Sequence, residues 1–154
     1  MKKITLLTLL LSLGLIVNAQ TKKVNPKYDE VLAKQLGAEE NGMKMYVLVI
    51  LKTGTNTTAT KNETDSLFRG HMDNIGRLVK INKLIVAGPL GKNDKTYRGI
   101  FILNTKSIDE AKEILATDPA FKAKLLDADI INWYGSAALA EYLKAEDKIW
   151  KSRY

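Results

Sequence analysis

The sequence predicts an α+β domain in which four strands form one antiparallel sheet. One observation behind this prediction is a set of four short apolar runs rich in β-branched residues, MYVLVILK, LIVAG, RGIFILN and DIINWYG. A second is that a segment of helical periodicity follows the first run and another follows the third. The last is that only a short polar stretch, GKNDK, turns the chain between the second and third runs, which is typical of a hairpin.

The first strand and the helix after it have the clearest patterns. MYVLVILK is followed by a polar loop rich in helix and strand breakers, TGTNTTATKNET. From about Thr64 to Asn82, apolar residues recur at helical spacing, which predicts an amphipathic helix. Those residues are Leu67, Phe68, Met72, Ile75, Leu78 and Val79. On the opposite side Arg69, Asp73 and Arg77 stand four residues apart, and we expect them to form a surface charge ladder.

The second half of the predicted sheet domain is delimited by turn and capping residues. The second strand stops at Gly88-Pro89, and RGIFILN follows as the third strand. Ser107 and Glu110 have the spacing of a capping box, which predicts the start of a second helix. That helix must stop before Pro119, because the residue before a proline disfavours the helical conformation.

Further helices are predicted at both ends of the chain. The first is entered through Asn25-Pro26 and ends at Gly37. The second is the amphipathic segment SAALAEYLKAEDKIW, whose large apolar residues are Leu139, Tyr142, Leu143 and Trp150. The inner order β-α-β-β-α-β is that of ferredoxin-like folds, with both helices on one face of the sheet. The expected organisation is a signal segment at 1–19, a helical extension at 20–43, the ferredoxin-like domain at 44–135 and a C-terminal helix at 136–154.

The first strand is apolar on both of its faces, which predicts a central strand covered on both sides. Its two alternating sets are Tyr46, Leu48 and Ile50 against Val47, Val49 and Leu51. The two predicted helices cover only one face, and an exposed apolar face of that size would be an interface or aggregation patch. We therefore expect a homodimer whose sheets pack face to face, with the terminal helices over the edges.

Residues 1–19 have the pattern of a cleaved secretory signal. Lys2 and Lys3 form a basic start, ITLLTLLLSLGLIV an apolar stretch, and Val17-Asn18-Ala19 a small-residue cleavage site. The apolar stretch is short for a membrane span, which needs ~20 residues. We therefore expect an exported protein, periplasmic or secreted, that begins near Gln20 and has no membrane attachment after cleavage. An uncleaved N-terminal anchor is the alternative.

The composition excludes several classes of function. Removal of nineteen residues from 154 leaves 135, the size of one domain. The absence of cysteine excludes thiol catalysis and thiolate metal sites, and a single histidine leaves any transition-metal site short of ligands, so no metal is expected. The net charge of +7 comes from scattered lysines rather than from a basic stripe interleaved with aromatic residues, so no nucleic-acid partner is expected.

One histidine and one aspartate carry the chemistry that the sequence suggests. His71, the only histidine, lies four residues after Leu67 and four before Ile75, on the apolar stripe of its helix. Asp118 follows about fifty residues later in an Asp-Pro step. Together they suffice for general acid/base catalysis, with Asp118 accepting the Nδ1 proton and fixing the tautomer of the imidazole. Two structural interpretations stay open: a core histidine satisfied by one hydrogen bond, and an aspartate that only caps a short helix at Ala120-Phe121.

Three runs, GHMDNIGRLVKINKLIVAGPLG, RGIFILNTKSIDEAKEILATDPAF and DIINWYG, resemble the YciI-like (YCII-related) family. The resemblance covers roughly residues 71–135, with MYVLVILK as the first strand. Its most specific parts are His71, Ala87-Gly88-Pro89 and Asp118-Pro119. The family is similar to the dimeric α/β-barrel superfamily, so the resemblance implies ferredoxin-like units that pair through their sheets. It also implies an active site built on His71 and Asp118, with activity unassigned for most members. Related barrels include isomerases, monooxygenases and peroxidases.

The other candidate site residues would bind a substrate rather than react with it. Arg98 precedes the third strand, where it would hold an anionic group bidentately or be a plain surface arginine. Tyr46 and Trp133 would line a pocket for an aromatic or conjugated ligand, or pack at an interface. Gly88 and Pro89, which belong to the resemblance, are the remaining substrate-binding candidates, but they lack the strand-to-helix glycine pattern of a phosphate site, which favours a structural turn.

These residues support one enzymatic hypothesis and one alternative from another class. The first is a small, exported, homodimeric lyase or isomerase that needs no cofactor. In it, His71 removes or shuttles a proton on a small organic substrate and Asp118 orients the imidazole. The alternative is a non-catalytic dimeric module that binds a small ligand.

Overall fold

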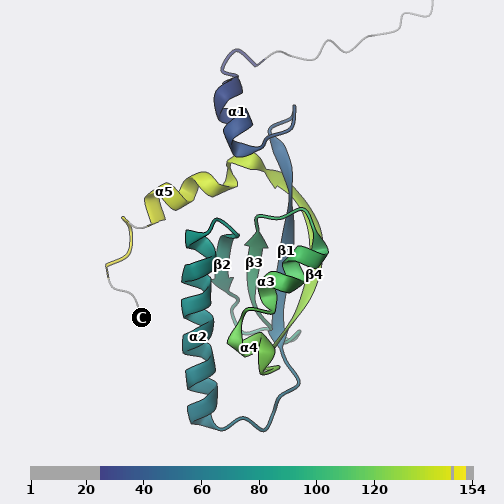
Figure 1. The fold of residues 1–154 in the computed structure, drawn as a ribbon, viewed down its shortest axis with the longest axis vertical. Coiled ribbons are helices and arrows are strands. Elements are labelled where there is room, and N and C mark those ends of the chain that lie inside the picture. Colours follow the sequence, from purple (N-terminus) through teal and green to yellow (C-terminus); the bar gives the residue numbers. More distant parts are fainter. Residues whose placement is uncertain (1–24, 147, 152–154) are drawn as a thin grey trace, which may run out of the picture.

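The computed structural model describes residues 25–146 and 148–151 of the chain. Four strands form one antiparallel sheet: β1 (Met43–Thr53), β2 (Leu84–Pro89), β3 (Tyr97–Leu103) and β4 (Leu126–Ser136). Their order across the sheet is β2-β3-β1-β4, so the first and third strands are central (Figure 1). This confirms the predicted α+β, ferredoxin-like fold. The predicted signal segment at 1–19 lies outside the described residues.

Two helices cover one face of the sheet, as predicted. They are α2 (Lys61–Lys80) and α3 (Ile108–Leu115), and a short helix, α4 (Pro119–Lys122), follows α3 (Figure 1). The main hydrophobic core lies between these helices and the sheet. Its buried members are Val47, Val49, Leu51, Leu78, Leu84, Phe101, Leu103, Ala111, Ile114 and Leu115.

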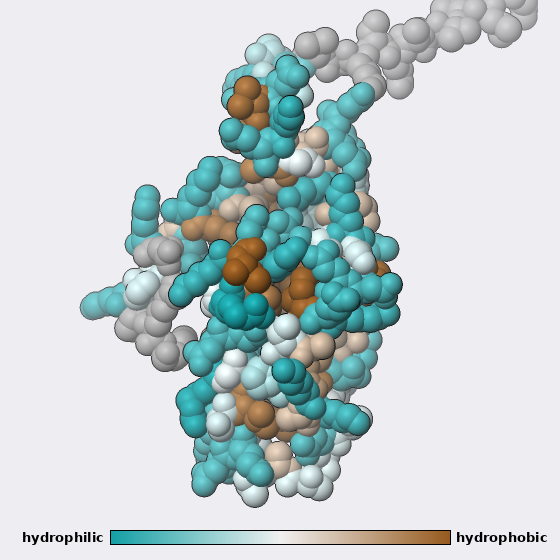
Figure 2. All heavy atoms as spheres, in the orientation of Figure 1, coloured by the Kyte–Doolittle hydropathy of each residue, from teal (hydrophilic) through white to brown (hydrophobic). Residues whose placement is uncertain are grey.

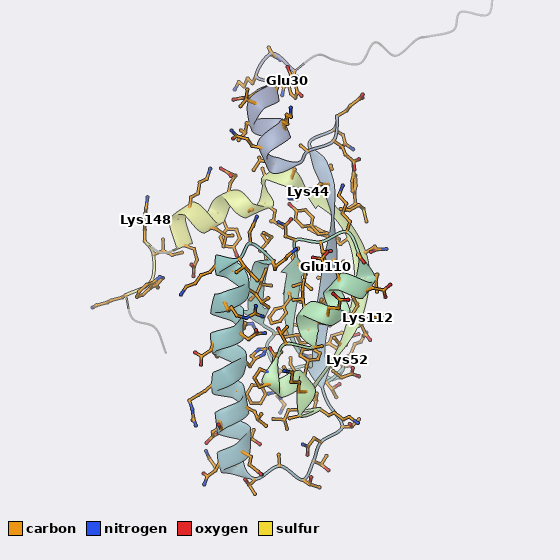
Figure 3. The ribbon with its side chains drawn as sticks, in the orientation of Figure 1. Glu30, Lys44, Lys52, Glu110, Lys112 and Lys148 are labelled. Carbon is orange, nitrogen blue, oxygen red and sulfur yellow. The ribbon has the colours of Figure 1, made fainter. Side chains whose placement is uncertain are left out.

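The capping boxes differ from the prediction. The complete box lies at the start of α2, where Thr60 and Glu63 satisfy each other's backbone N–H groups. The predicted box at α3 is half formed: Ser107 Oγ accepts from the N–H of Glu110, but the carboxylate of Glu110 binds elsewhere. Glu110 (labelled in Figure 3) instead accepts from Lys83 Nζ at 2.6 Å and from the hydroxyl of Thr105. A lysine and a hydroxyl compete for that carboxylate, so the box loses its second bond.

The terminal helices are shorter than predicted. Helix α1 (Glu30–Leu36) begins only after Asp29, whose carboxylate accepts from the N–H of Leu32, while Asn25 forms a turn before it. Gly37 ends the helix at φ +70°, a conformation that glycine adopts without strain. No residue of α1 is buried, and hydrophobic atoms are visible on its surface in Figure 2.

The C-terminal segment is a 3₁₀ helix, η1 (Ala137–Tyr142), followed by one turn of α-helix, α5 (Leu143–Glu146). It packs on the second face of the sheet rather than along an edge, and forms a second cluster there with Tyr46, Ile85 and Ile102. Leu139 and Ala140 of the 3₁₀ helix and Leu143 of α5 pack against this cluster. Trp150, which the prediction placed on the apolar face of this helix, is exposed.

The second face of the sheet is therefore partly covered within one chain. The hydroxyl of Tyr142 donates to the carbonyl of Ile85 and fixes the C-terminal segment over β2. Beyond the segment, Ile50 and Ile100 are half-buried and Ile131 remains 46% exposed. Pairing of two copies through this face stays a prediction. Among the described residues, no helix is both long and apolar enough to cross a membrane.

Candidate functional site

Helix α2 carries three buried residues in a single row toward the sheet: His71, Asn74 and Leu78. Their spacing of three and four residues is that of neighbours on one helix face. Leu78 belongs to the main hydrophobic core, so its packing fixes the rotation of α2 about its axis. The same rotation turns two polar side chains inward, and each of them needs a hydrogen-bond partner there.

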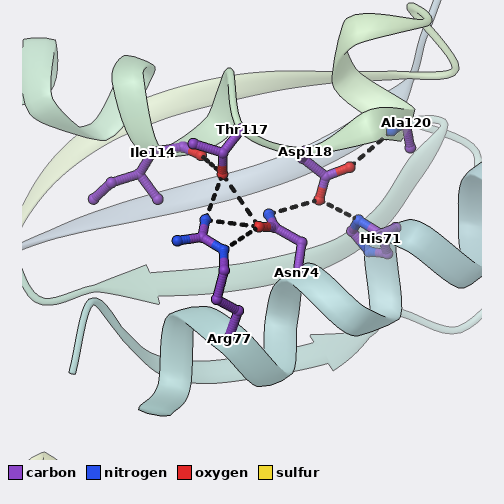
Figure 4. A network of polar contacts seen from close by, with 7 residues as sticks. All are labelled: His71, Asn74, Arg77, Ile114, Thr117, Asp118 and Ala120. Carbon is purple, nitrogen blue, oxygen red and sulfur yellow. Dashed lines mark hydrogen bonds and ion pairs between the residues drawn. The ribbon is translucent and has the colours of Figure 1, made fainter. Parts of the chain in front are cut away.

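Asp118 supplies that partner from the junction between α3 and α4. Its residue is 1% exposed, and its two oxygens have different tasks. Oδ1 accepts from the N–H of Ala120 at 2.8 Å, which caps α4, while Oδ2 lies 2.7 Å from His71 Nδ1 (Figure 4). The cap and the histidine contact are therefore compatible, because each uses its own oxygen.

A glycine allows α2 and α4 to approach closely beside this pair. A Cβ atom on Gly70 would lie 2.9 Å from Cγ of Pro119, closer than real Cβ contacts occur. Gly70 precedes His71 and Pro119 follows Asp118, so the tight crossing lies directly next to the contact between the two side chains. The ring of proline cannot turn aside as a flexible side chain would.

Gly70→Ala is therefore expected to be neutral or to destabilise the protein by about 1 kcal/mol, because overpacking outweighs the gain in helix propensity. Gly76→Ala is the matched control, since a Cβ on Gly76 would meet nothing within 4 Å in the same helix. It should stabilise by about 0.5–1 kcal/mol. Urea denaturation of both variants measures the difference, and equal stabilisation by both would contradict the close approach.

The ring of His71 is held between two phenylalanines. Phe101 of β3 stacks on it with ring centroids 5.8 Å apart and an angle of 15°, and Phe68 meets it edge-on at 5.9 Å. An ionised carboxylate only accepts hydrogen bonds, so the contact with Asp118 assigns the proton to Nδ1. In the neutral ring, Nε2 then carries the free lone pair.

The other ring nitrogen reaches the surface. Within residues 25–146 and 148–151, every polar side-chain atom that is fully buried has a hydrogen-bond partner. No hydrogen bond joins Nε2 of His71 to these residues, so Nε2 is not fully buried, and 9% of the His71 side chain as a whole is exposed. The imidazole is thus anchored through one nitrogen and open at the other.

The carboxylate of Asp118 is stabilised in its charged form. Burial by itself raises the pKa of this carboxyl group, since a charge is poorly solvated in the interior. The hydrogen bond and charge of His71, the N–H of Ala120 and the amide of Asn74 outweigh burial and hold the pKa below its ordinary value. Asp118 therefore stays ionised and accepts from Nδ1 at neutral pH.

Sequence reasoning missed three residues around this pair. Asn74 Nδ2 lies 3.4 Å from Asp118 Oδ2, and the Asn74 carbonyl accepts from Arg77 (Figure 4). Arg77 is exposed, as the predicted charge ladder requires, but its hydrogen bonds go to Asn74 and Thr117 rather than to Asp73. The spacing 71, 74 and the adjacency of 117 to 118 were the signals in the sequence.

Three of the predicted substrate-binding residues lie in the hairpin of β2 and β3. Gly88 and Pro89 belong to the end of β2 and pair with β3, where Pro89 lies opposite Gly99. Arg98 is exposed, and its carbonyl accepts from the N–H of Leu90. None of the hydrogen bonds found around His71 and Asp118 in the described residues includes Arg98, Gly88 or Pro89.

The structure does not bring Tyr46 and Trp133 together with His71. Both lie in the second hydrophobic cluster, on the face of the sheet opposite the helices, with ring centroids 5.6 Å apart. The hydroxyl of Tyr46 donates to the carbonyl of Ser136 at 2.9 Å, which ties β1 to the end of β4. Burial raises the pKa of Tyr46, so the phenol keeps the proton that it donates. In this chain the two aromatic residues pack under the C-terminal segment.

The described residues contain no group of three or more histidine and acidic side chains that could hold a metal ion. The hydrogen-bonded set around His71 instead joins one imidazole, one carboxylate, one amide, one guanidinium and one hydroxyl. Such a set can bind and transfer protons.

Comparison with known proteins gives only weak likenesses, and these are to solved structures. No family model matches the chain, and no curated protein matches it. One similar solved structure is the 5-chloro-2-hydroxyhydroquinone dehydrochlorinase of Burkholderia phenoliruptrix, in complex with 2,5-dihydroxybenzoquinone. The two chains are 23% identical over 56% of this chain and 92% of the other, with a TM-score of 0.41. A likeness of this size says nothing about activity, so membership of the YciI-like family stays a prediction.

Proposed function

We propose that the protein is a cofactor-independent lyase or isomerase that transfers a proton on a small organic substrate. The observation that carries this proposal is the asymmetry of the His71 ring. Its Nδ1 is held 2.7 Å from the buried carboxylate of Asp118, and its Nε2 is unpaired among the described residues and not fully buried. This is the arrangement of a general base with its orienting acid.

In the proposed reaction, the lone pair of Nε2 takes a proton from a carbon next to a carbonyl group. The electrons of the broken C–H bond move into an enolate, and the imidazole becomes an imidazolium. Asp118 compensates this new charge without accepting the Nδ1 proton. An isomerase returns the proton from Nε2 to a different atom of the substrate, whereas a lyase releases it while the substrate expels a leaving group.

The surroundings of the ring favour small and partly apolar substrates. Only 9% of the His71 side chain is exposed, which favours a small substrate over a bulky one. Phe68 and Phe101 flank the ring and offer apolar surfaces. Small cyclic ketones and enolisable diketones combine an acidic C–H bond with an apolar ring, and we propose this class as the first to test.

Deuterium uptake tests the reaction directly. The protein, purified without a polyhistidine tag, is incubated in D₂O with a panel of small cyclic ketones and diketones, and exchange is followed by proton NMR. Diethyl pyrocarbonate then modifies imidazole nitrogens, and the ultraviolet absorbance of carbethoxyimidazole reports on one residue because the chain has a single histidine. We expect modification at Nε2 and the loss of catalysed exchange for at least one compound of the panel.

Two results would overturn the proposal. One is that complete modification of His71 leaves the exchange rate unchanged; the other is that the imidazole of the folded protein resists the reagent, which would mean that Nε2 is inaccessible. Saturable changes in the NMR signals of the His71 ring, without deuterium uptake by the bound compound, would favour the alternative of a non-catalytic binding module.

A further inference from the structure

A line of hydrogen bonds connects the surface of the protein to the buried Asp118. Arg77 is exposed, Asn74 is buried, and Asp118 lies beneath them. Nε and Nη2 of Arg77 donate to Asn74 Oδ1 at 3.1 and 2.8 Å, and Asn74 Nδ2 points to Asp118 Oδ2 at 3.4 Å (Figure 4). An exposed guanidinium is therefore linked through one amide to the carboxylate that holds His71.

The partners of Asn74 allow only one orientation of its amide. Arg77 has donors and no acceptor, so the amide atom that faces it must be the carbonyl oxygen. The ionised carboxylate of Asp118 has acceptors and no donor, so the atom that faces it must be the NH₂ group. If the amide turned over, donor would meet donor at Arg77 and acceptor would meet acceptor at Asp118.

Thr117 holds the guanidinium in place. Arg77 Nη2 donates to Thr117 Oγ1 at 2.8 Å, and the threonine hydroxyl has a carbonyl acceptor at 2.7 Å, that of Ile114 near the end of α3. Arg77 itself lies in the last turn of α2. A positive charge is favourable at the C-terminal end of a helix, and here it lies near two of them.

We propose that Asn74, Arg77 and Thr117 are positioning residues that fix the Asn74 amide and so aim the Oδ2 atom of Asp118 at His71 Nδ1. This inference rests on the proposed function, because aiming the carboxylate matters for catalysis only if His71 is the base. Arg77 touches neither His71 nor a substrate. It acts through Asn74, whose N–H becomes a stronger donor when its carbonyl binds a cation.

The variant Arg77→Met tests this role without a substrate. Its side chain retains apolar bulk but cannot donate, so the Asn74 carbonyl loses its cationic partner and only Asp118 and the hydroxyl of Thr117 still orient the amide. Nitrogen NMR of the single imidazole, recorded where the ring is neutral, should show a smaller fraction of the Nδ1–H tautomer than in the wild type. Carbethoxylation at Nε2 should slow by about two- to tenfold, the value of one hydrogen bond.

Matched variants separate positioning from general destabilisation. Arg69→Met removes another exposed arginine of α2 and should leave the tautomer and the reaction rate unchanged. Thr117→Val should change the tautomer population and the reaction rate in the same direction as Arg77→Met, but more weakly. Arg77→Lys should lie between Arg77→Met and the wild type in both measurements, because an ammonium group still donates. Urea denaturation checks that all four variants remain folded.

A single Nδ1–H tautomer and an unchanged carbethoxylation rate in folded Arg77→Met would overturn the positioning role. The proposed function would survive that result, because it depends on His71 and Asp118 alone. Conversely, if carbethoxylation of His71 leaves catalysed exchange intact, the proposed function fails while the tautomer shift in Arg77→Met still shows that the network orients the ring.

Discussion

His71→Gln is expected to lower the rate of catalysed deuterium exchange by about 10²- to 10⁴-fold, the usual contribution of a general base. Glutamine is close to histidine in size, and its NH₂ group can still donate to Oδ2 of Asp118, so the buried carboxylate keeps a partner. It has no nitrogen lone pair that accepts a proton near neutral pH. The measurement is kcat/KM for exchange of the best compound of the panel.

Asp73→Asn is the control for this loss. Asp73 lies in the same helix and is exposed, two residues from His71 and therefore on a different face. It should retain the full rate. If His71→Gln is folded by circular dichroism and urea denaturation and exchanges as fast as Asp73→Asn, another residue performs the proton transfer.

Asp118→Ala is expected to destabilise the protein by about 3 kcal/mol. The helix cap at α4 contributes roughly 1 kcal/mol. The donors of His71 and Asn74 would remain in the interior without an acceptor, at a cost of about 1–3 kcal/mol each, which water entering the space left by the carboxylate would reduce. Denaturation in urea at neutral pH measures the change. Asp73→Ala, with an exposed carboxylate in α2, should change the stability by less than about 0.5 kcal/mol.

The pH dependence of this effect has a defined sign. The folded pKa of Asp118 lies below its ordinary value, so the folded state favours the charged carboxylate. The stability that it contributes is full above the ordinary pKa of about 3.9 and is lost as the pH falls through the lower folded value. The stability difference between the wild type and Asp118→Ala should therefore shrink in acid. A difference that grows on acidification would contradict the ionised state of Asp118.

The sequence predicted the strands and helices well where packing imposes a strict period. The β-branched runs and the helical stripe of α2 each bury one or two faces, and burial leaves the pattern visible in the residues. The pair of His71 and Asp118 was also within reach, because the chain has so few groups that transfer protons. Asn74, Arg77 and Thr117 were not, since a polar side chain reveals its partner only when distant elements are placed together.

The position of Tyr46 shows a different limit. Alternation in β1 separates Tyr46 and Leu48 from Val47 and Val49, but both sets are apolar. When neither face is polar, the pattern cannot tell which set the helices cover. In the structure the odd-numbered set packs under α2 and α3, and Tyr46 lies under the C-terminal segment.

That segment shows how an apolar spacing can fit two conformations. Leu139 and Leu143 are four residues apart, as an α-helix requires, and Ala140 and Leu143 are three apart, which suits a 3₁₀ helix. In the structure the segment Ala137–Tyr142 takes the 3₁₀ form, and the hydroxyl of Tyr142 binds the carbonyl of Ile85. A bond to a strand almost sixty residues earlier cannot be inferred from local periodicity.

The divided carboxylate of Asp118 has a consequence for the history of such a chain. One oxygen caps α4 and the other binds the imidazole, so both folding and the orientation of His71 favour an aspartate at this position. If the proposed reaction takes place, relatives that have lost it would still need an acceptor to cap α4, whereas at position 71 any side chain that donates to Oδ2 would suffice. In such relatives, the residue at position 71 should therefore vary before the residue at position 118, which folding alone would retain.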